Sequence, residues 1–307
     1  MCNPLYLRRC GAALIVCLSV GASSCFATFM PVDAQSFAVL GQFSNNQTNF
    51  NNGTITGDIG IGATRQFTIS NASVVGNVRF SGTVNQSGLS GGAIPGPGPY
   101  TVSGGGTVSG GTVANDPVVA SALNATNSLS QTLGGEAGTA LTLTSTQTIN
   151  ASSGILDGTG NRVFMTSSVN LSNATTLTIN GSASDYVVVN VTDNNPAFNG
   201  AIVLTGGITT DQVLFNMFGG NYTTHTGGPT LTISTNGAIT RGIFLDPNGA
   251  MQINHSDLRG RFWGGDVQNQ QIVSGANITA PVPEPSAFIL AGLGASLLYW
   301  ARRKKAY

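Results

Sequence analysis

The stretch FTISNASVVGNVRFSGTV (residues 67–84) has the pattern that decides the fold. Short β-branched and apolar runs alternate with Asn and Gly, which is typical of short strands separated by turns. The residues expected to point inward are Ile69, Val74, Val78 and Phe80. The expected corners are Asn71, Gly76 and Gly82. Short strands broken by such corners predict coils stacked along an axis.

The same pattern recurs on both sides of this stretch. FAVLGQF (37–43) and TITGDIGIG (54–62) precede it, and further short apolar runs follow from ALTLTSTQTI (140–149) to AMQINHS (250–256). Their starts lie roughly 10 to 20 residues apart, which fits solenoid rungs better than the long hairpins of an up-and-down barrel. We therefore predict a mainly β protein with one solenoid domain over residues 37–278, preceded by a linker at 28–36.

One helix is expected to interrupt the strands. Asp116 is a good N-cap and Pro117 suits the first helical position. Apolar and small residues then recur at helical spacing until Gly134 and Gly135, namely Val119, Ala122, Thr126, Leu129 and Leu133. This predicts a helix over 117–133 that buries one stripe against a sheet. Residues 88–111, rich in Gly, Ser and Pro, are expected to form an excursion outside the core.

Charge and cysteine content limit the possible partners. Between residues 28 and 280, six arginines face eleven acidic residues, so the body has a net charge of about −5, which argues against nucleic acid as a partner. All four cysteines lie within the first 25 residues. The body therefore has no disulfide and no cysteine metal site.

The amino end predicts export. Arg8 and Arg9 precede an apolar run over 11–20, and Cys25-Phe26-Ala27 offers a cleavage site, so we expect a signal peptide at 1–27 that enters the Sec translocon as a helix. A lipoprotein signal, with Cys25 as the lipidated residue, is the alternative interpretation.

The carboxyl end, residues 279–307, has three parts. The first is a short motif of Val282, Pro283, Glu284 and Pro285. An uncharged span at 287–301 follows, which as a helix would cover about 22 Å of a ~30 Å hydrocarbon core. The last part is a positive cluster that would stop and orient the helix at the cytoplasmic face, formed by Arg302, Arg303, Lys304 and Lys305.

This order resembles the PEP-CTERM sorting signal of Gram-negative bacteria. The resemblance implies an inner-membrane-anchored precursor, transient recognition and cleavage by an exosortase, and release or transfer to the cell surface. The alternative is an ordinary tail anchor that follows a chance Pro-Glu-Pro.

The body resembles two related families. YVVVNVTDNNPAFNG (186–200), DQVLFNMFGG (211–220), RGIFLDPNGAMQI (241–253) and LRGRFWGGDV (258–267) are similar to the carboxyl half of the choice-of-anchor A domain. FAVLGQF with TGDIGIG, followed by a long helix, is similar to the bacterial ice-binding-like domain. Both resemblances imply a right-handed β-helix with a helix packed alongside.

No set of residues predicts catalysis, a metal or a cofactor. A Ser-His-Asp arrangement can be imagined at His255, Ser256 and Asp257, but adjacent residues of a strand point to opposite faces. A surface pair of His255 and Asp257 is the simpler interpretation, and His225 lies elsewhere, within NYTTHT (221–226). Residues 193–195 and 246–248 offer oxygen ligands, but turns in which Asx side chains bind the backbone explain them.

Threonines offer the one candidate binding surface. Thr142, Thr144, Thr146 and Thr148 alternate and are expected to share the outer face of one strand, as are Thr230 and Thr232. Such a ladder suits ice or polysaccharide, although threonine is also simply a good β-former on a solvated face.

The sequence thus favours a non-enzymatic exported protein of the cell surface or extracellular matrix, associated with the exopolysaccharide of a biofilm. The first alternative is a module that binds ice or acts as an adhesin. The second is a hydrolase, for which His225, His255 and Asp257 are the candidate residues.

Overall fold

The computed structural model describes residues 29–41, 47–63, 65–82, 84–87, 98–265 and 269–281. The expected signal peptide, the motif Val282–Pro285, the span 287–301 and the basic cluster Arg302–Lys305 lie outside these ranges. Within the described ranges, no helix is both long enough and apolar enough to cross a membrane.

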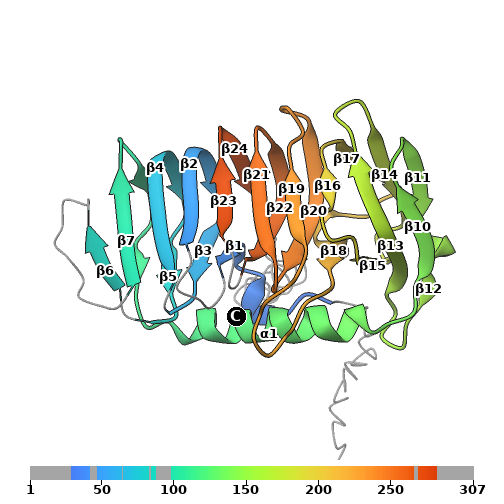
Figure 1. Ribbon diagram of the computed structural model, residues 1–307, viewed down its shortest axis with the longest axis horizontal. Helices are drawn as coiled ribbons and strands as arrows, with labels where there is room; N and C mark the ends of the chain where they lie inside the picture. The colour runs from blue at the N-terminus through green and yellow to red at the C-terminus, as the bar shows by residue number, and fades with distance from the viewer. Residues whose placement is uncertain are drawn as a thin grey trace, which may run out of the picture.

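The body winds into stacked coils whose strands pair in parallel with those of the next coil (Figure 1). The exception is β12 (Ile155–Leu156), which pairs antiparallel with β13 (Arg162–Leu171). Several strands bend at a corner and continue on the next side of the coil. Asn71, for example, has a φ of 50° in the middle of β4 (Gln66–Val75), where the sequence predicted a corner. The predicted β-helix is confirmed.

Each coil contributes to three walls, of which one is covered by the helix and two are open. The helix-covered face contains β9 (Thr112–Val113), β5 (Val78–Phe80), β3 (Asp58–Ile61), β1 (Phe37–Gly41), the second halves of β22 (Asp257–Gly264) and β20 (Ile239–Asp246), β18 (Val213–Met217), β15 (Val187–Val191), the first half of β13, and β10 (Thr139–Leu143).

The first open face contains β6 (Val84–Ser87), β7 (Gly98–Ser103), the first halves of β4 and β2 (Gln47–Thr56), β23 (Gln270–Val273), β21 (Ala250–Asn254), β19 (Thr230–Ile233), β16 (Ala197–Phe198) and the second half of β13. The second open face contains β8 (Thr107–Val108), the second halves of β4 and β2, β24 (Ala276–Thr279), the first halves of β22 and β20, β17 (Ala201–Thr205), β14 (Thr176–Asn180) and β11 (Gln147–Asn150).

The described part of the body begins and ends in the middle of the stack. From β1 it coils to one end at β9, and α1 (Pro117–Gly134) then carries it back to the opposite end at β10. The later coils return toward the middle, where β22 pairs with β1, and β23 and β24 pair with β2. The red strands thus lie beside the blue ones in Figure 1. The first and last coils close the fold against each other.

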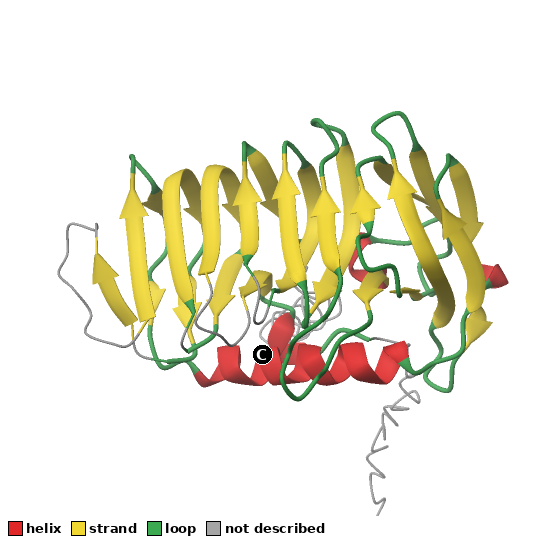
Figure 2. Cartoon of the chain, in the orientation of Figure 1, coloured by secondary structure: helices red, strands yellow, loops and turns green. Residues whose placement is uncertain are grey.

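Helix α1 lies along the outside of one wall (Figure 2) and extends one residue beyond the predicted 117–133. Asp116 caps it as predicted, since the Val118 N–H donates to the Asp116 carboxylate at 2.9 Å. Its apolar residues, Val119, Ala122, Leu123 and Leu133, pack against outward-facing residues of the wall, Phe37, Leu40, Val188, Leu214, Leu245 and Trp263. Burying one such large apolar side chain contributes about 1.5–3 kcal/mol, so this contact fixes the helix in place.

Part of the predicted excursion at 88–111 belongs to the β-helix. β7 and β8 both pair with β4, and the Tyr100 side chain lies fully buried between Phe67 and Phe80, with ring centroids 5.7 and 5.4 Å away. The glycine content of this segment suggested a loop outside the core, but the glycines that follow β7 form a turn between strands. Gly104 and Gly105 have φ values of 57° and 80° there.

The expected linker at 28–36 also packs on the body. Phe29, Met30 and Ala34 are buried, and the Phe29 ring meets Tyr186 edge-on at 5.8 Å. A short 3-10 turn, η1 (Val32–Ala34), contacts α1. Isolated apolar residues in a short segment carry no periodicity, so the sequence did not show this contact.

Candidate surface-binding faces

The first open face presents a continuous row of uncharged side chains, and we call it the amide face. Its inward positions are buried apolar residues such as Leu231, Ile233 and Ile253, so the alternate positions point outward. The central row crosses eight strands in register and consists of Asn170, Ala197, Thr232, Gln252, Gln271, Asn49, Thr68 and Thr101. Neighbouring strands of a sheet lie about 4.8 Å apart, so the side chains of this row follow one another at about that spacing.

The residues beside this row are also uncharged. On one side lie Ser234, Asn254, Val273, Asn51, Ser70 and Ser103, and on the other lie Thr230, Ala250, Gln47 and Gln66. Two of them form a hydrogen bond, in which Ser234 Oγ donates to Asn254 Oδ1 at 2.6 Å. Over the described strands the face therefore offers amide and hydroxyl groups and no ionised side chain.

The second open face carries charge at its centre, and we call it the arginine face. Its central row continues through paired strands as Arg241, Arg259, Thr279, Thr56 and Val75. Asp257 occupies the neighbouring row beside Asn277. The ladder is interrupted between β17 and β20, which belong to separate sheets, and there Arg241 Nη1 donates to the Ile202 carbonyl at 3.2 Å.

The predicted threonine ladder does not lie along one strand. Thr142 belongs to β10, Thr144 and Thr146 lie in the turn that follows, and Thr148 belongs to β11 on the arginine face. All four side chains are exposed. The structure instead aligns Thr148 with Thr178 of the next coil. Thr230 and Thr232 do share the outside of β19, on the amide face.

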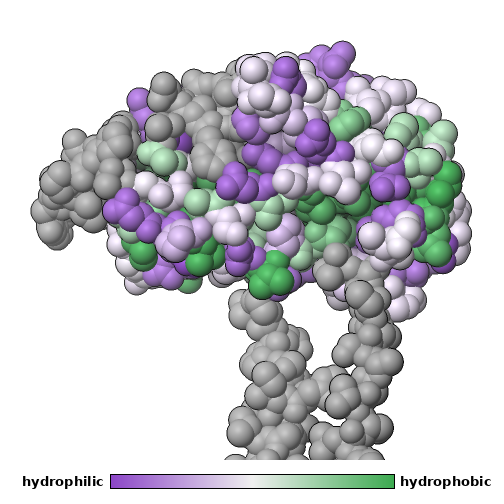
Figure 3. All heavy atoms as spheres, turned by 90° about the horizontal axis from the view of Figure 1, so that it is seen from below, coloured by the Kyte–Doolittle hydropathy of each residue, from purple (hydrophilic) through white to green (hydrophobic). Residues whose placement is uncertain are grey.

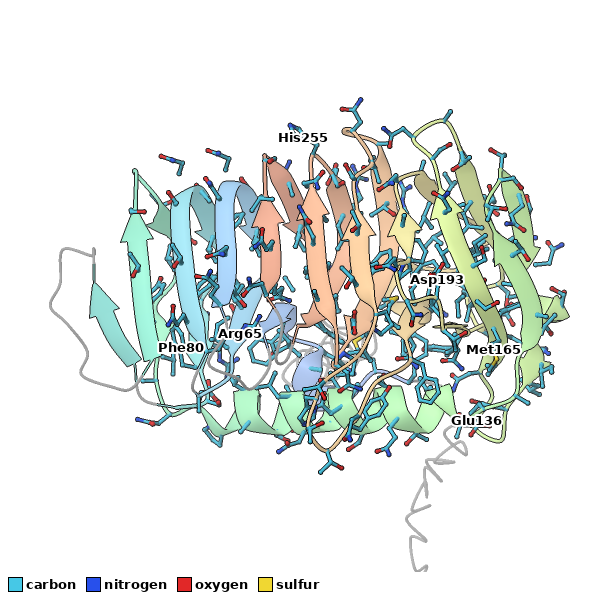
Figure 4. The ribbon with its side chains drawn as sticks, viewed as in Figure 1. Arg65, Phe80, Glu136, Met165, Asp193 and His255 are labelled. Atoms are coloured by element: carbon cyan, nitrogen blue, oxygen red, sulfur yellow. The ribbon has the colours of Figure 1, made fainter. Side chains whose placement is uncertain are left out.

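The histidine candidates lie apart. His255 stands at the corner between the two open faces, on the side away from α1 (Figure 4). His225 lies in the loop between β18 and β19, where neighbouring Tyr222 contacts Ser130 of α1 at 2.8 Å. The Ser256 hydroxyl is buried and donates to the Asn254 carbonyl at 2.6 Å, so its proton is already engaged. The structure does not bring these residues together as a nucleophile and base.

The two carboxylates considered as oxygen ligands form turns. Asp193 accepts hydrogen bonds from the Asn195 and Val169 N–H groups at 2.9 and 2.8 Å. Asp246 accepts one from the Gly249 N–H at 2.9 Å, and burial raises the pKa of its carboxyl well above the usual value. Among the described residues, no group of three or more His, Cys, Asp and Glu side chains is placed to hold a metal ion.

The sorting motif follows directly on the folded body. Ala280 N–H donates to the Thr56 carbonyl at 3.0 Å, and Arg261 Nη2 donates to the Pro281 carbonyl at 3.4 Å. Arg261 is itself held by Asp211, with Nε and Oδ1 3.1 Å apart. Pro281 thus leaves the body where the arginine face meets the helix-covered face, which in a three-walled coil is the corner opposite the amide face.

Two features of these faces were not predicted from the sequence. The amide row was hidden because its members are far apart in the chain. The arginine pair could have been found from a repeat in the sequence. Arg-Gly-x-Phe occurs at Arg241 and again at Arg259, and this spacing of 18 residues is the length of one coil.

Comparisons with known proteins agree with this geometry. Residues 18–274 match the family described as an ice-binding-like adhesive domain, and residues 281–305 match the PEP-CTERM protein-sorting motif. A comparison with curated protein sequences finds no match.

Solved structures share the fold at low identity. An ice-binding protein from an Arctic yeast is 16% identical, with a TM-score of 0.50 over 85% of this chain and 98% of its own. One from an Antarctic biological consortium is 13% identical, with a TM-score of 0.50 over 83% of this chain and 92% of its own. The chain therefore belongs to the ice-binding-like adhesive domain family and carries a PEP-CTERM protein-sorting motif at its carboxyl end.

Proposed function

We propose that the protein is an exported, surface-displayed binding module whose amide face lies against a regular, uncharged, hydroxyl-rich surface such as ice or a neutral polysaccharide. The observation that carries this proposal is the uncharged row across eight paired strands. Charged side chains lose favourable hydration when a surface covers them, whereas amides and hydroxyls can exchange water for hydroxyl partners. A row without charge therefore suits a surface that has none.

The attachment point supports the choice of face. The sorting motif begins next to Pro281, and six residues, 281–286, separate the folded body from the apolar span at 287. Extended chain spans at most about 3.6 Å per residue, so the precursor would hold this corner within about 20 Å of the membrane. The amide face, opposite that corner, would then point away from the membrane. Sec export and transient exosortase processing at Val282–Pro285 are part of the same proposal.

The matrix and hydrolase interpretations now have different support. A neutral exopolysaccharide is one surface that the amide face fits, so matrix association remains within the proposal. For hydrolysis, the engaged Ser256 hydroxyl and the separation of His225 from His255 supply no observation in favour. A non-enzymatic module is the function that the geometry supports best.

The test places a charge on one open face at a time. We expect Thr232→Arg to reduce binding at least tenfold, a loss of about 1.4 kcal/mol. Thr178→Arg is the matched control, because Thr178 is also a half-buried, outward-facing strand threonine, but on the arginine face. Thermal hysteresis and ice recrystallisation measure ice binding, and co-sedimentation with insoluble cellulose measures binding to a neutral polysaccharide.

Three outcomes would contradict the proposal. One is a wild-type protein that binds neither ice nor cellulose. Another is a Thr232→Arg variant that binds as well as wild type. The third is a Thr178→Arg variant that loses as much binding as Thr232→Arg, since a general loss would not assign the function to the amide face.

A further inference from the structure

The arginine face holds two positive side chains directly opposite each other. Arg241 and Arg259 are ladder partners on adjacent parallel strands, and both are in the outward register. Like charges opposite each other in a sheet destabilise it by roughly 0.2–1 kcal/mol. The pair therefore costs stability in a body whose net charge is about −5, and no feature of the strand pairing requires the second arginine.

Three other arginines of the body lie near acidic residues. Arg79 binds Asp116 at 2.6 Å and Asp58 at 3.5 Å, and Arg261 binds Asp211 at 3.1 Å. Hydrogen bonds from Ser182 lower the pKa of the Asp185 carboxyl, and the charge of nearby Arg162 also contributes.

Arg65 is fully buried and donates to the Thr48 hydroxyl at 2.7 Å and the Gln47 carbonyl at 3.1 Å. Among the residues that the structure describes, Arg241 and Arg259 form no ion pair within 4.0 Å, unlike Arg79 and Arg261.

Arg241 is held in place by the break in the sheet. Its Nη1 donates to the Ile202 carbonyl of β17, a strand that forms no ladder with β20. A guanidinium carries five N–H groups, so this bond leaves most of its donors available. Arg259, one strand away, is exposed, and the row continues through the hydroxyls of Thr279 and Thr56. The result is a line of hydrogen-bond donors with two charges at one end.

We propose that Arg241 and Arg259 bind the carboxylate groups of an anionic polysaccharide that crosses the strands along this row. Guanidinium matches carboxylate in a planar, two-bonded geometry, and charge assistance makes such bonds about twice as strong as neutral ones. Thr279 and Thr56 would bind sugar hydroxyls beside the charged group. This ligand differs in class from the uncharged surface assigned to the amide face, and the site stands independently of that proposal.

Binding at this site must overcome the repulsion of an acidic body. The negative net charge disfavours a polyanion at long range, so the local pair must supply the attraction. Salt screens both the distant repulsion and the local attraction, so the interaction is expected to depend on a small number of contacts and only weakly on salt. This distinguishes it from a broad basic patch, which would bind any polyanion.

The experiment uses the exported protein and measures its retardation in affinity gels that contain polygalacturonate. The matched ligand is the same polymer with its carboxylates methyl-esterified, and DNA and anionic phospholipid vesicles are the competing polyanions. We expect Arg259→Gln to weaken polygalacturonate binding at least tenfold. Arg162→Gln, which removes an equal charge elsewhere, should change binding less than twofold.

Arg241→Gln is a second variant that could disturb the break in the sheet, so its melting temperature is measured with its binding. Arg259→Lys keeps the charge but loses the planar geometry, and we expect intermediate binding. The proposal is overturned if the wild type does not bind polygalacturonate, if the esterified polymer binds equally well, or if Arg259→Gln and Arg162→Gln behave alike. Equal, Arg259-dependent retention of DNA or vesicles would also overturn it, because it would show a general cation patch.

Discussion

The helix-covered face and the amide face are built from the same coils, but α1 buries the first and leaves the second exposed. In one coil, Leu214 of β18 points outward and is buried under α1, while Thr232 of β19 points outward and remains partly exposed. Both strands turn aromatic or aliphatic residues inward, so the inner core does not distinguish them. The outward residues therefore distinguish the wall that the helix covers from the wall that stays open.

Seen from the helix side, apolar and polar residues are interspersed over the body (Figure 3). Most of the apolar surface of the wall, including Val188, Leu245 and Trp263, is already occupied by α1. The covered wall thus serves stability, whereas the amide face remains open.

The largest difference between the two walls should appear in truncations of outward residues. We expect Leu214→Ala to lower the free energy of unfolding by about 2–5 kcal/mol, because it removes buried contacts with α1 and leaves a cavity. Thr232→Ala, the matched change on the amide face, should stay within about 0.5 kcal/mol. Denaturant unfolding measures both. Equal effects would show that α1 does not stabilise its wall.

Asparagines sharpen the comparison because the same residue type occurs on both walls. Asn216 is buried beneath α1, where its Nδ2 donates to the Ser130 carbonyl at 3.0 Å and to Asn190 Oδ1 at 2.9 Å. We expect Asn216→Ala to cost about 1–3 kcal/mol, since it leaves buried partners without a hydrogen bond. Asn170→Ala, on the exposed row of the amide face, should have little effect on stability. A similar cost for both variants in denaturant unfolding would contradict this.

Removal of a carboxylate should give the smallest difference in stability between the two walls, and this difference should depend on pH. Burial raises the pKa of Asp116, but the hydrogen bonds from Arg79 and the Val118 N–H and the charge of Arg79 outweigh burial, so the pKa lies below its ordinary value. Asp116→Ala should cost about 0.5–2 kcal/mol through loss of the helix cap. Asp257→Ala, which removes a carboxylate from the open arginine face, should lower the free energy of unfolding by less.

The pH dependence of the Asp116 contribution has a defined sign. A lowered pKa means that the folded state favours the ionised carboxylate, so this stabilisation is present above the unfolded pKa of about 3.9 and is lost as pH falls through the folded pKa. Thermal melts of wild type and Asp116→Ala should therefore differ near pH 7 and converge as the pH falls below about 4. A difference that grew on acidification would show that the sign is wrong.

Much of the body could be predicted from local patterns. The alternation in residues 67–84 predicted inward positions that are all buried, Ile69, Val74, Val78 and Phe80. The Asp116-Pro117 start and the helical spacing after it predicted α1 almost to the residue. These predictions succeeded because a cap or a two-residue period depends on neighbours in the chain.

The composition of the two open faces could not be predicted from local patterns. Thr142 to Thr148 alternate as one strand would, but the chain turns a corner between Leu143 and Gln147 and distributes them over two walls. Tyr100 lies in a composition typical of loops, yet it fills the core of a terminal coil. In both places the position of a turn, which sequence pattern locates poorly, decided the outcome.

By itself, then, the sequence determined the class of fold, the capped helix, the negative charge of the body and the expected signals at its two ends. Only the tertiary structure decided which side chains stand next to each other across the coils. The coils differ in length: Arg241 pairs with Arg259 after 18 residues, whereas Val187 pairs with Val213 after 26. The two-residue period fixes which side chains point outward, but lateral alignment depends on these unequal turns, so the amide row and the arginine pair emerge only when the coils are stacked.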